Sequence, residues 1–169
     1  LLLKGKEYSG KAITRHKIQK ATWQGNEIYS LNIGDANEAV DVHFEKDGGI
    51  RFAESPGQCV SVEGGRHSSG TAVITYHYCG SEINHFVRNN DDTISPKKNM
   101  NVILALREGS LELQDKSNVA DDKRLIFDIP EGIGFASPTK ESDNGVQNNH
   151  DISESHSDSV SLILAHPKD

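Results

Sequence analysis

The residues of this chain with the clearest chemistry are Cys59 and Cys79, and the aromatic trio Tyr76-His77-Tyr78 that precedes the second cysteine. Two thiols can form a covalent bridge, and aromatic rings offer flat apolar faces with polar edges. The cysteines flank two runs rich in β-forming residues, CVSV and TAVITYHY, which are separated by a glycine- and serine-rich turn. We therefore expect two neighbouring strands, joined by a Cys59–Cys79 disulfide that closes a hairpin-like unit.

The amino-acid composition makes this bridge important for stability. Apolar residues make up 34% of the chain and aromatic residues 6%, which is a thin supply for a core. A disulfide that closes a loop of this size stabilises a protein by about 3 kcal/mol in the chain-entropy model. It also predicts a secreted or extracellular protein, because disulfides persist in oxidising compartments. The alternative is a pair of buried free thiols in a cytosolic protein.

Charge and motifs exclude several classes of function. The formal net charge of −7 argues against binding to nucleic acid, and no apolar run reaches the roughly 18 residues of a membrane span. The catalytic motifs Gly-x-Ser-x-Gly and His-Glu-x-x-His and the phosphate-binding loop do not occur in the sequence. His150 and His156 lie in a polar segment without cysteine partners, so we expect neither a metal nor a cofactor. The sequence thus predicts a protein that is not an enzyme.

The elements that position the cysteines and the rings are short. From about Tyr8, strand-like runs alternate with turn signals such as Asp47-Gly48-Gly49, and no window keeps a helical period. Three segments share one shape, a strand that carries phenylalanine, a polar turn, and an isoleucine that opens the next strand. Their phenylalanines are Phe44, Phe86 and Phe127. This pattern predicts an all-β protein with an internal repeat of four strands, three times over, packed around a shared core.

The chain divides into two parts by composition. We expect residues 1–135 to form one domain and residues 136–169 to form an acidic tail rich in Ser and Asn, which ends in a short strand-like run, VSLILAHPKD. The first residues, Leu1-Leu2-Leu3-Lys4, read as a processed or trimmed end. The terminal run is expected either to dock on the domain or to belong to a neighbour.

Residues 47–94 resemble one repeat of the ricin-B-type β-trefoil lectins. The matching pieces are Gly49-Ile50, Cys59-Val60-Ser61-Val62, Gly70-Thr71-Ala72-Val73 up to Cys79, and Ile83-Asn84-His85-Phe86. In outline the resemblance extends over about residues 6–135. It implies a β-trefoil of three four-stranded repeats, in which the three phenylalanines take the core place that the family gives to tryptophan.

The resemblance also implies a sugar pocket in the middle repeat. In that family an aspartate and an asparagine hold sugar hydroxyls, and an aromatic ring stacks on the apolar face of the sugar. Here Ser61 stands in the place of the aspartate, Ile83 in that of the asparagine with Asn84 adjacent, and Tyr76, His77 or Tyr78 supplies the ring. The expected site therefore comprises Ser61, Tyr76, His77 and Asn84, without a carboxylate.

Strand alternation offers a plainer interpretation of the same rings. If the strand continues through Tyr78, the two tyrosines share one face and His77 lies on the other. A tyrosine on the inner face then packs in the core with its hydroxyl at the rim, rather than serving as a platform for a sugar.

Two functions follow as expectations. The first is a non-enzymatic, lectin-like module that recognises glycans or glycoproteins and works within a larger protein or beside a partner chain or catalytic subunit. The second is a protein-interaction trefoil whose sugar pockets have decayed, such as a toxin or effector subunit or a protease inhibitor. The missing aspartate favours the second function, and the preserved cysteine-bridged unit favours the first.

Overall fold

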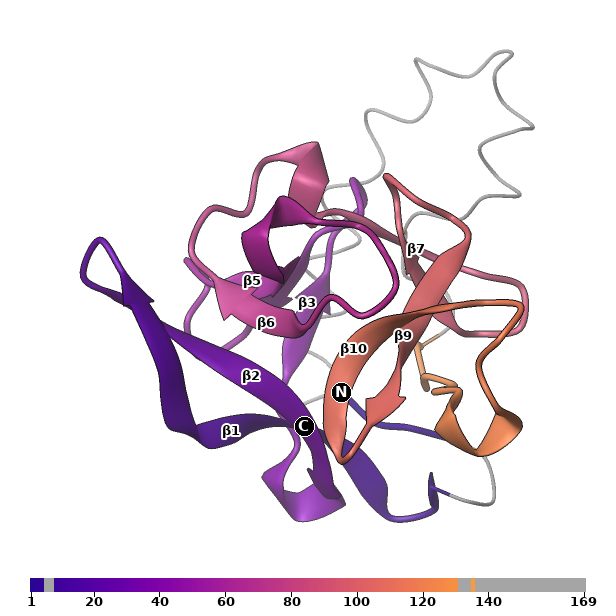
Figure 1. Cartoon of the computed structure of the whole chain (residues 1–169). Coiled ribbons are helices and arrows are strands. Elements are labelled where there is room, and N and C mark those ends of the chain that lie inside the picture. The colour runs from indigo at the N-terminus through magenta and orange to yellow at the C-terminus, as the bar shows by residue number, and fades with distance from the viewer. Residues whose placement is uncertain (5–7, 131–134, 136–169) are drawn as a thin grey trace.

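The computed structural model describes residues 1–4, 8–130 and 135, and within these residues the protein is all-β (Figure 1). The described strands are β1 (Lys11–Trp23), β2 (Asn26–Asp35), β3 (Val42–Phe44), β4 (Ile50–Phe52), β5 (Cys59–Val62), β6 (Val73–Tyr76), β7 (Phe86–Arg88), β8 (Ile94–Pro96), β9 (Val102–Arg107) and β10 (Ser110–Asp115). Between them lie short 3-10 turns, η2 (Ala36–Glu38), η3 (Glu63–Gly65), η4 (Glu82–Asn84) and η5 (Asp121–Lys123). The all-β prediction is confirmed.

Most of these strands belong to one hydrogen-bonded sheet of order β3-β4-β5-β6-β2-β10-β9, with β1 beside β2. Consecutive strands form antiparallel hairpins, of which β1–β2 is the longest and extends away from the rest (Figure 1). Strands β7 and β8 pair separately. Because β6 bonds to β2 through Ser30 and Ile74, the cysteine-bearing hairpin lies against the long first hairpin.

Two turns repeat the same backbone geometry. After β3, Glu45 N–H donates to the Gly49 carbonyl at 2.8 Å, and after β7, Asn89 N–H donates to the Thr93 carbonyl at 2.8 Å. The fourth residue of each turn, Gly48 or Asp92, has a positive φ, of 107° and 68° respectively. These turns correspond to the polar turns of the expected repeat.

The three phenylalanines of that repeat are all buried, and Phe86 and Phe127 occupy matching places, since their N–H groups donate to the carbonyls of Gly48 and Asp92, but Phe44 does not. Phe44 pairs directly with Ile50, whereas Ile94 pairs with Arg88, and Phe86 lies opposite Pro96. Measured from the turn, Phe86 therefore stands two positions earlier than Phe44. The expectation that both take one core place is wrong, because strand register and not sequence spacing fixes the position of a side chain.

Glycine is required at Gly48 for a steric reason besides its φ. A Cβ there would lie 2.6 Å from the carbonyl oxygen of Phe86, which is inside contact distance. The close approach lets Phe86 N–H donate to the Gly48 carbonyl at 2.8 Å. The turn after β3 is in this way joined to the start of β7.

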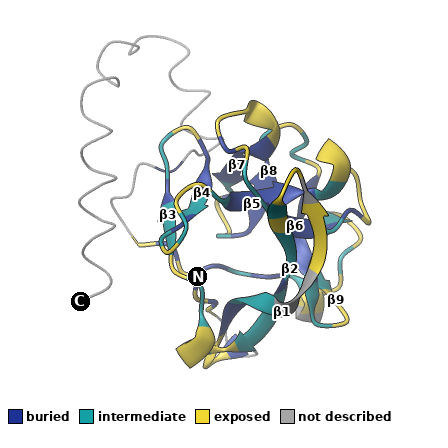
Figure 2. Cartoon of the chain, turned by 90° about the vertical axis from the view of Figure 1, so that its left-hand side faces the viewer, coloured by how far each residue is buried: buried dark blue, intermediate teal, exposed yellow. Residues whose placement is uncertain are grey.

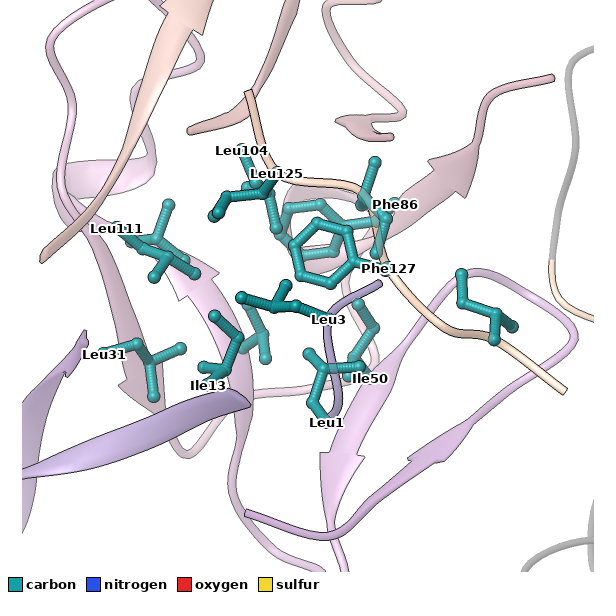
Figure 3. Packing of buried hydrophobic residues seen from close by; sticks show 14 of the residues in the cluster. Leu1, Leu3, Ile13, Leu31, Ile50, Phe86, Leu104, Leu111, Leu125 and Phe127 are labelled. Atoms are coloured by element: carbon teal, nitrogen blue, oxygen red, sulfur yellow. The ribbon is translucent and has the colours of Figure 1, made fainter. Parts of the chain in front are cut away.

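The core collects side chains from the whole described chain (Figure 3). Leu3 lies beside Phe127 and Leu1 belongs to the same cluster, and the backbone closes the contact, since Lys4 N–H donates to the Ile126 carbonyl at 2.9 Å. Strands β5, β7 and β8 are largely buried, while the turns at the periphery are exposed (Figure 2). Early and late segments thus share one core.

Two expected strands differ from the structure. The runs KAITRHKI and KATWQ form one continuous strand, β1, because irregularities between Arg15 and Ala21 absorb the break in the sequence pattern. The last run, RLIFDI, makes isolated bridges, Arg124 with Ala105 and Phe127 with Leu3. The expected tail, residues 136–169, lies outside the described residues.

Candidate functional site

The disulfide between Cys59 and Cys79 is present, with the two Cα atoms 5.8 Å apart. Strands β5 and β6 pair in register from Cys59 with Tyr76 to Val62 with Val73, so the bridge fixes the chain just beyond the end of β6. Both cysteines are buried. The predicted hairpin and its bridge are confirmed.

Beside this hairpin lies a concave site of about 600 Å³, which we call the middle hollow. One wall comes from the β1–β2 hairpin, another from β5 and β6, and the third from η3, η4 and the residues around them. Its lining residues are Lys20, Ala21, Thr22, Ile28, Ser61, Val62, Glu63, Gly64, Gly65, Ile74, Tyr76, Tyr78, Ser81, Ile83 and Asn84. Ser61, Tyr76 and Asn84, three of the four predicted site residues, therefore surround one cavity.

The polar residues among the walls bond to one another. Ser61 Oγ donates to Asn84 Oδ1, and Asn84 Nδ2 donates to the Tyr78 carbonyl. Ser61 and Asn84 are only 2% and 3% exposed. This pair, which the resemblance led us to expect as a partner for sugar hydroxyls, is thus satisfied within the protein, which lowers its capacity to hold the hydroxyls of a ligand.

Three rings meet at one side of the middle hollow. The His77 ring lies 4.7 Å from that of Tyr76 and 4.4 Å from that of Tyr78, and the two tyrosine rings are 5.8 Å apart, measured between centroids. The expectation that His77 faces away from the tyrosines is wrong, because β6 ends at Tyr76 and alternation stops there. His77 does not line the hollow, and both of its ring nitrogens are buried without a hydrogen-bond partner. Its visible role is to pack between the tyrosines.

The rim of the middle hollow carries a matched pair of charges. Lys20 Nζ lies 3.4 Å from Glu63 Oε2, which joins the long hairpin to η3. Tyr78 is 56% exposed, and its hydroxyl donates to Gln24 Oε1 at 3.2 Å, while Ile83 is 40% exposed. The mouth therefore presents an aromatic ring and an aliphatic side chain next to a neutralised ion pair.

A second concave site, which we call the first hollow, has about 690 Å³ and lies between β1, β2, η2 and the turn after β4. Arg15 places its guanidinium carbon 4.8 Å from the centre of the Tyr29 ring, which is cation–π geometry. Carboxylates of Glu38, Asp41 and Glu54 also line the site. Its character is polar and charged.

Tyr29 is held neutral in the first hollow. Its hydroxyl donates to the Glu27 carboxylate, and this hydrogen bond raises the pKa of Tyr29 above 10.0, assisted by burial and by the negative charge itself. The sequence did not predict this hollow. Tyr29 pairs with Gln19 across the hairpin, and an irregularity in the ladder separates that pair from Arg15. We see no motif that would have brought them together.

The other predictions about the site concern absences. In the part of the chain that the structure describes, no three His, Cys, Asp or Glu residues gather to hold a metal ion. His150 and His156 lie outside that part. Nor is any helix among the described residues long and apolar enough to cross a bilayer.

Comparison of the chain with models of protein families, with curated proteins and with solved structures finds no match. The resemblance to ricin-B-type lectins therefore rests on the sequence motifs alone. The proposed function therefore depends on the geometry of the two hollows.

Proposed function

We propose that this protein is a non-enzymatic carbohydrate-binding module and that the middle hollow is its ligand site. The observation that carries the proposal is the meeting of Ser61, Tyr76 and Asn84 around one cavity with Tyr78 at its mouth. Sugars bind proteins through ring C–H groups on aromatic faces and through hydroxyls on nearby polar atoms. The middle hollow offers both, with the aromatic part dominant.

The proposal includes a β-trefoil fold. Support comes from the equivalent turns after β3 and β7, and from the bridge between Leu3 and Phe127, which brings the start of the described chain to its last bonded segment. Three four-stranded units around one axis would produce such closure. The turn that would repeat the geometry a third time falls on residues 131–134, outside the described residues.

The disulfide supports a secreted or extracellular protein, since such bonds persist in oxidising compartments. A single open site on a small domain binds a glycan weakly, so useful affinity requires several copies or a partner chain. We infer that the module acts as part of a larger assembly that displays glycan-binding sites together.

A glycan array with the folded, disulfide-bonded protein tests the proposal. We expect binding to a defined set of glycans, lost by tenfold or more in Tyr78→Ala, because stacking on this exposed ring is removed. Tyr29→Ala, in the first hollow, is the matched control and should leave binding unchanged. Absence of binding to every glycan by a sample with native near-ultraviolet circular dichroism would sink the proposal.

A second candidate is a protein-interaction module, and one observation favours it. The hydrogen bonds that join Ser61, Asn84 and the Tyr78 carbonyl leave an apolar cavity beside the exposed Tyr78 and Ile83. Such a cavity also suits an apolar side chain of a partner protein. Binding to a partner that survives complete deglycosylation of that partner, yet fails with Tyr78→Ala, would select this candidate over the first.

A further inference from the structure

The walls of the middle hollow are apolar where the family resemblance leads one to expect a carboxylate. Ile28 from β2 and Ile74 from β6 share one face of the sheet, because Ser30 pairs with Ile74, and Ile83 of η4 lines the same cavity. Ile74 is only 4% exposed, so the packing around it fixes its side chain, and Ile28 and Ile83 stand beside it. A group that enters between them gains contact with hydrocarbon on several sides.

The buried hydrogen bonds disfavour a ligand that offers only hydroxyl groups to the cavity. Ser61 Oγ and Asn84 Oδ1 bond to each other, and the Asn84 amide also donates to the Tyr78 carbonyl. A hydroxyl pushed against these walls loses water and meets groups already engaged, which costs about 1–3 kcal/mol for each unpaired group. A methyl group in the same place loses nothing and buries apolar area.

The charges at the mouth favour an uncharged ligand. Lys20 and Glu63 neutralise each other across the rim. Because the two charges pair with each other, an acidic sugar finds no free cation and a basic sugar no free anion in this ion pair unless it is broken. The two tyrosine rings stand at 71° to each other, so they form an aromatic corner that fits C–H groups.

We propose that the middle hollow binds a neutral saccharide through a methyl group carried on the sugar ring. The methyl group is either the C5-methyl of a 6-deoxy sugar or the methyl of an N-acetyl group, and it lies between Ile28, Ile74 and Ile83. The ring C–H groups rest on Tyr76 and Tyr78. This inference depends on the carbohydrate-binding function proposed above and names the sugar class for that site.

Matched sugar pairs test the proposal by NMR titration of the full, disulfide-bonded chain. The first pair is L-fucose and D-arabinopyranose, which differ by the C5-methyl, and the second is N-acetylglucosamine and N-formylglucosamine, which differ by the acetyl methyl. In at least one pair we expect the methyl-bearing member to bind about fourfold more tightly, the effect of burying one methyl group. The pair that shows this preference identifies the source of the methyl group.

The same titration reports where the methyl group lies. The side-chain methyl resonances of Ile28 and Ile74 should shift with the methyl-bearing sugar and stay in place with its partner. Ile28→Thr is the informative variant, because Ile28 is half-buried and a hydroxyl in its place should abolish the preference while leaving the fold intact. The wild-type comparison stands even if this variant fails to fold.

Two outcomes would overturn the inference, and they differ. Equal binding of both members of each pair, with shifts at Tyr78, removes the methyl preference but leaves the glycan site in place. Absence of shifts at Tyr76, Tyr78 and both isoleucines with every sugar removes the proposed function and this inference together.

Discussion

The two hollows of this protein are similar in size and opposite in chemistry. The middle hollow, about 600 Å³, is walled by aliphatic and aromatic side chains, and its polar residues bond to one another. The first hollow, about 690 Å³, mixes Arg15 with carboxylates and holds a tyrosine whose ring is covered by a guanidinium. Cavity volume therefore says little about the ligand, whereas the state of the polar groups says a great deal.

Tyr29 in the first hollow and Tyr78 at the middle hollow show the same contrast. Tyr29 has a cation against its ring and a carboxylate on its hydroxyl, so both ends are occupied by the protein. Tyr78 is exposed at the mouth, where its hydroxyl donates to Gln24 and its ring contacts those of Tyr76 and His77. Of the two, Tyr78 has the ring that a ligand can still reach.

Removal of the disulfide should have the largest effect on stability. This bond supports the middle hollow and not the first hollow. The double substitution of Cys59 and Cys79 by alanine should lower the free energy of unfolding by about 3 kcal/mol. Denaturant unfolding under non-reducing conditions measures this loss. The loss should be accompanied by faster amide exchange in β5 and β6 than around the first hollow, and equal exchange in both regions would contradict the contrast.

Ser61→Ala should have the next largest effect. It removes the donor to the buried Asn84 Oδ1, and we expect a loss of about 1–2 kcal/mol in the free energy of unfolding. Thr14→Ala is a matched control at the first hollow, where the hydroxyl donates to the Asn32 carbonyl at 3.4 Å in a half-buried setting. A larger loss for Thr14→Ala than for Ser61→Ala would reverse our ranking of the two sites.

Two substitutions of His77 test how the three rings beside the middle hollow stabilise the protein. His77→Ala should cost about 1 kcal/mol by removing the ring between Tyr76 and Tyr78. His77→Phe should cost less than half of that or stabilise the protein, because neither ring nitrogen makes a hydrogen bond. Thermal unfolding of both variants at one pH measures the difference. Equal destabilisation by the two substitutions would show that the nitrogens matter.

The smallest expected effect is a change in titration at the first hollow. Since the hydrogen bond to Glu27 raises the pKa of Tyr29 above 10.0, Glu27→Gln should move this ionisation to lower pH. The neutral tyrosine is favoured in the folded state, so its stabilising contribution is present below pH 10 and is lost as the pH rises through the higher pKa. Ultraviolet titration of the tyrosinates detects the shift. An unchanged titration curve would contradict the hydrogen bond.

The sequence predicted the all-β class, the cysteine bridge and the turn at Asp47-Gly48-Gly49, since these depend on local residue types. It failed where the outcome depends on strand register and length. Phe44 and Phe86 look equivalent by spacing but pair differently, and the alternation of Tyr76, His77 and Tyr78 ends because the strand ends.

The candidate site was predicted in part for the same reason. Ser61, Tyr76 and Asn84 surround one cavity, because the cysteines and their flanking strands bring them together. The wall that carries Lys20 and Ile28 comes from a different hairpin and depends on the long-range pairing of β2 with β6. The first hollow depends on an irregularity in the β1–β2 ladder, which no local sequence pattern predicts.

The packing of Leu3 against Phe127 has a consequence for the order of folding events. During synthesis the hairpin of β5 and β6, its disulfide and η4 are available well before residues 125–127 are made. The core lacks those residues until then, and contacts between such distant segments form slowly. The middle hollow can therefore form early. The core of the molecule is completed later, when one of the last described segments is synthesised.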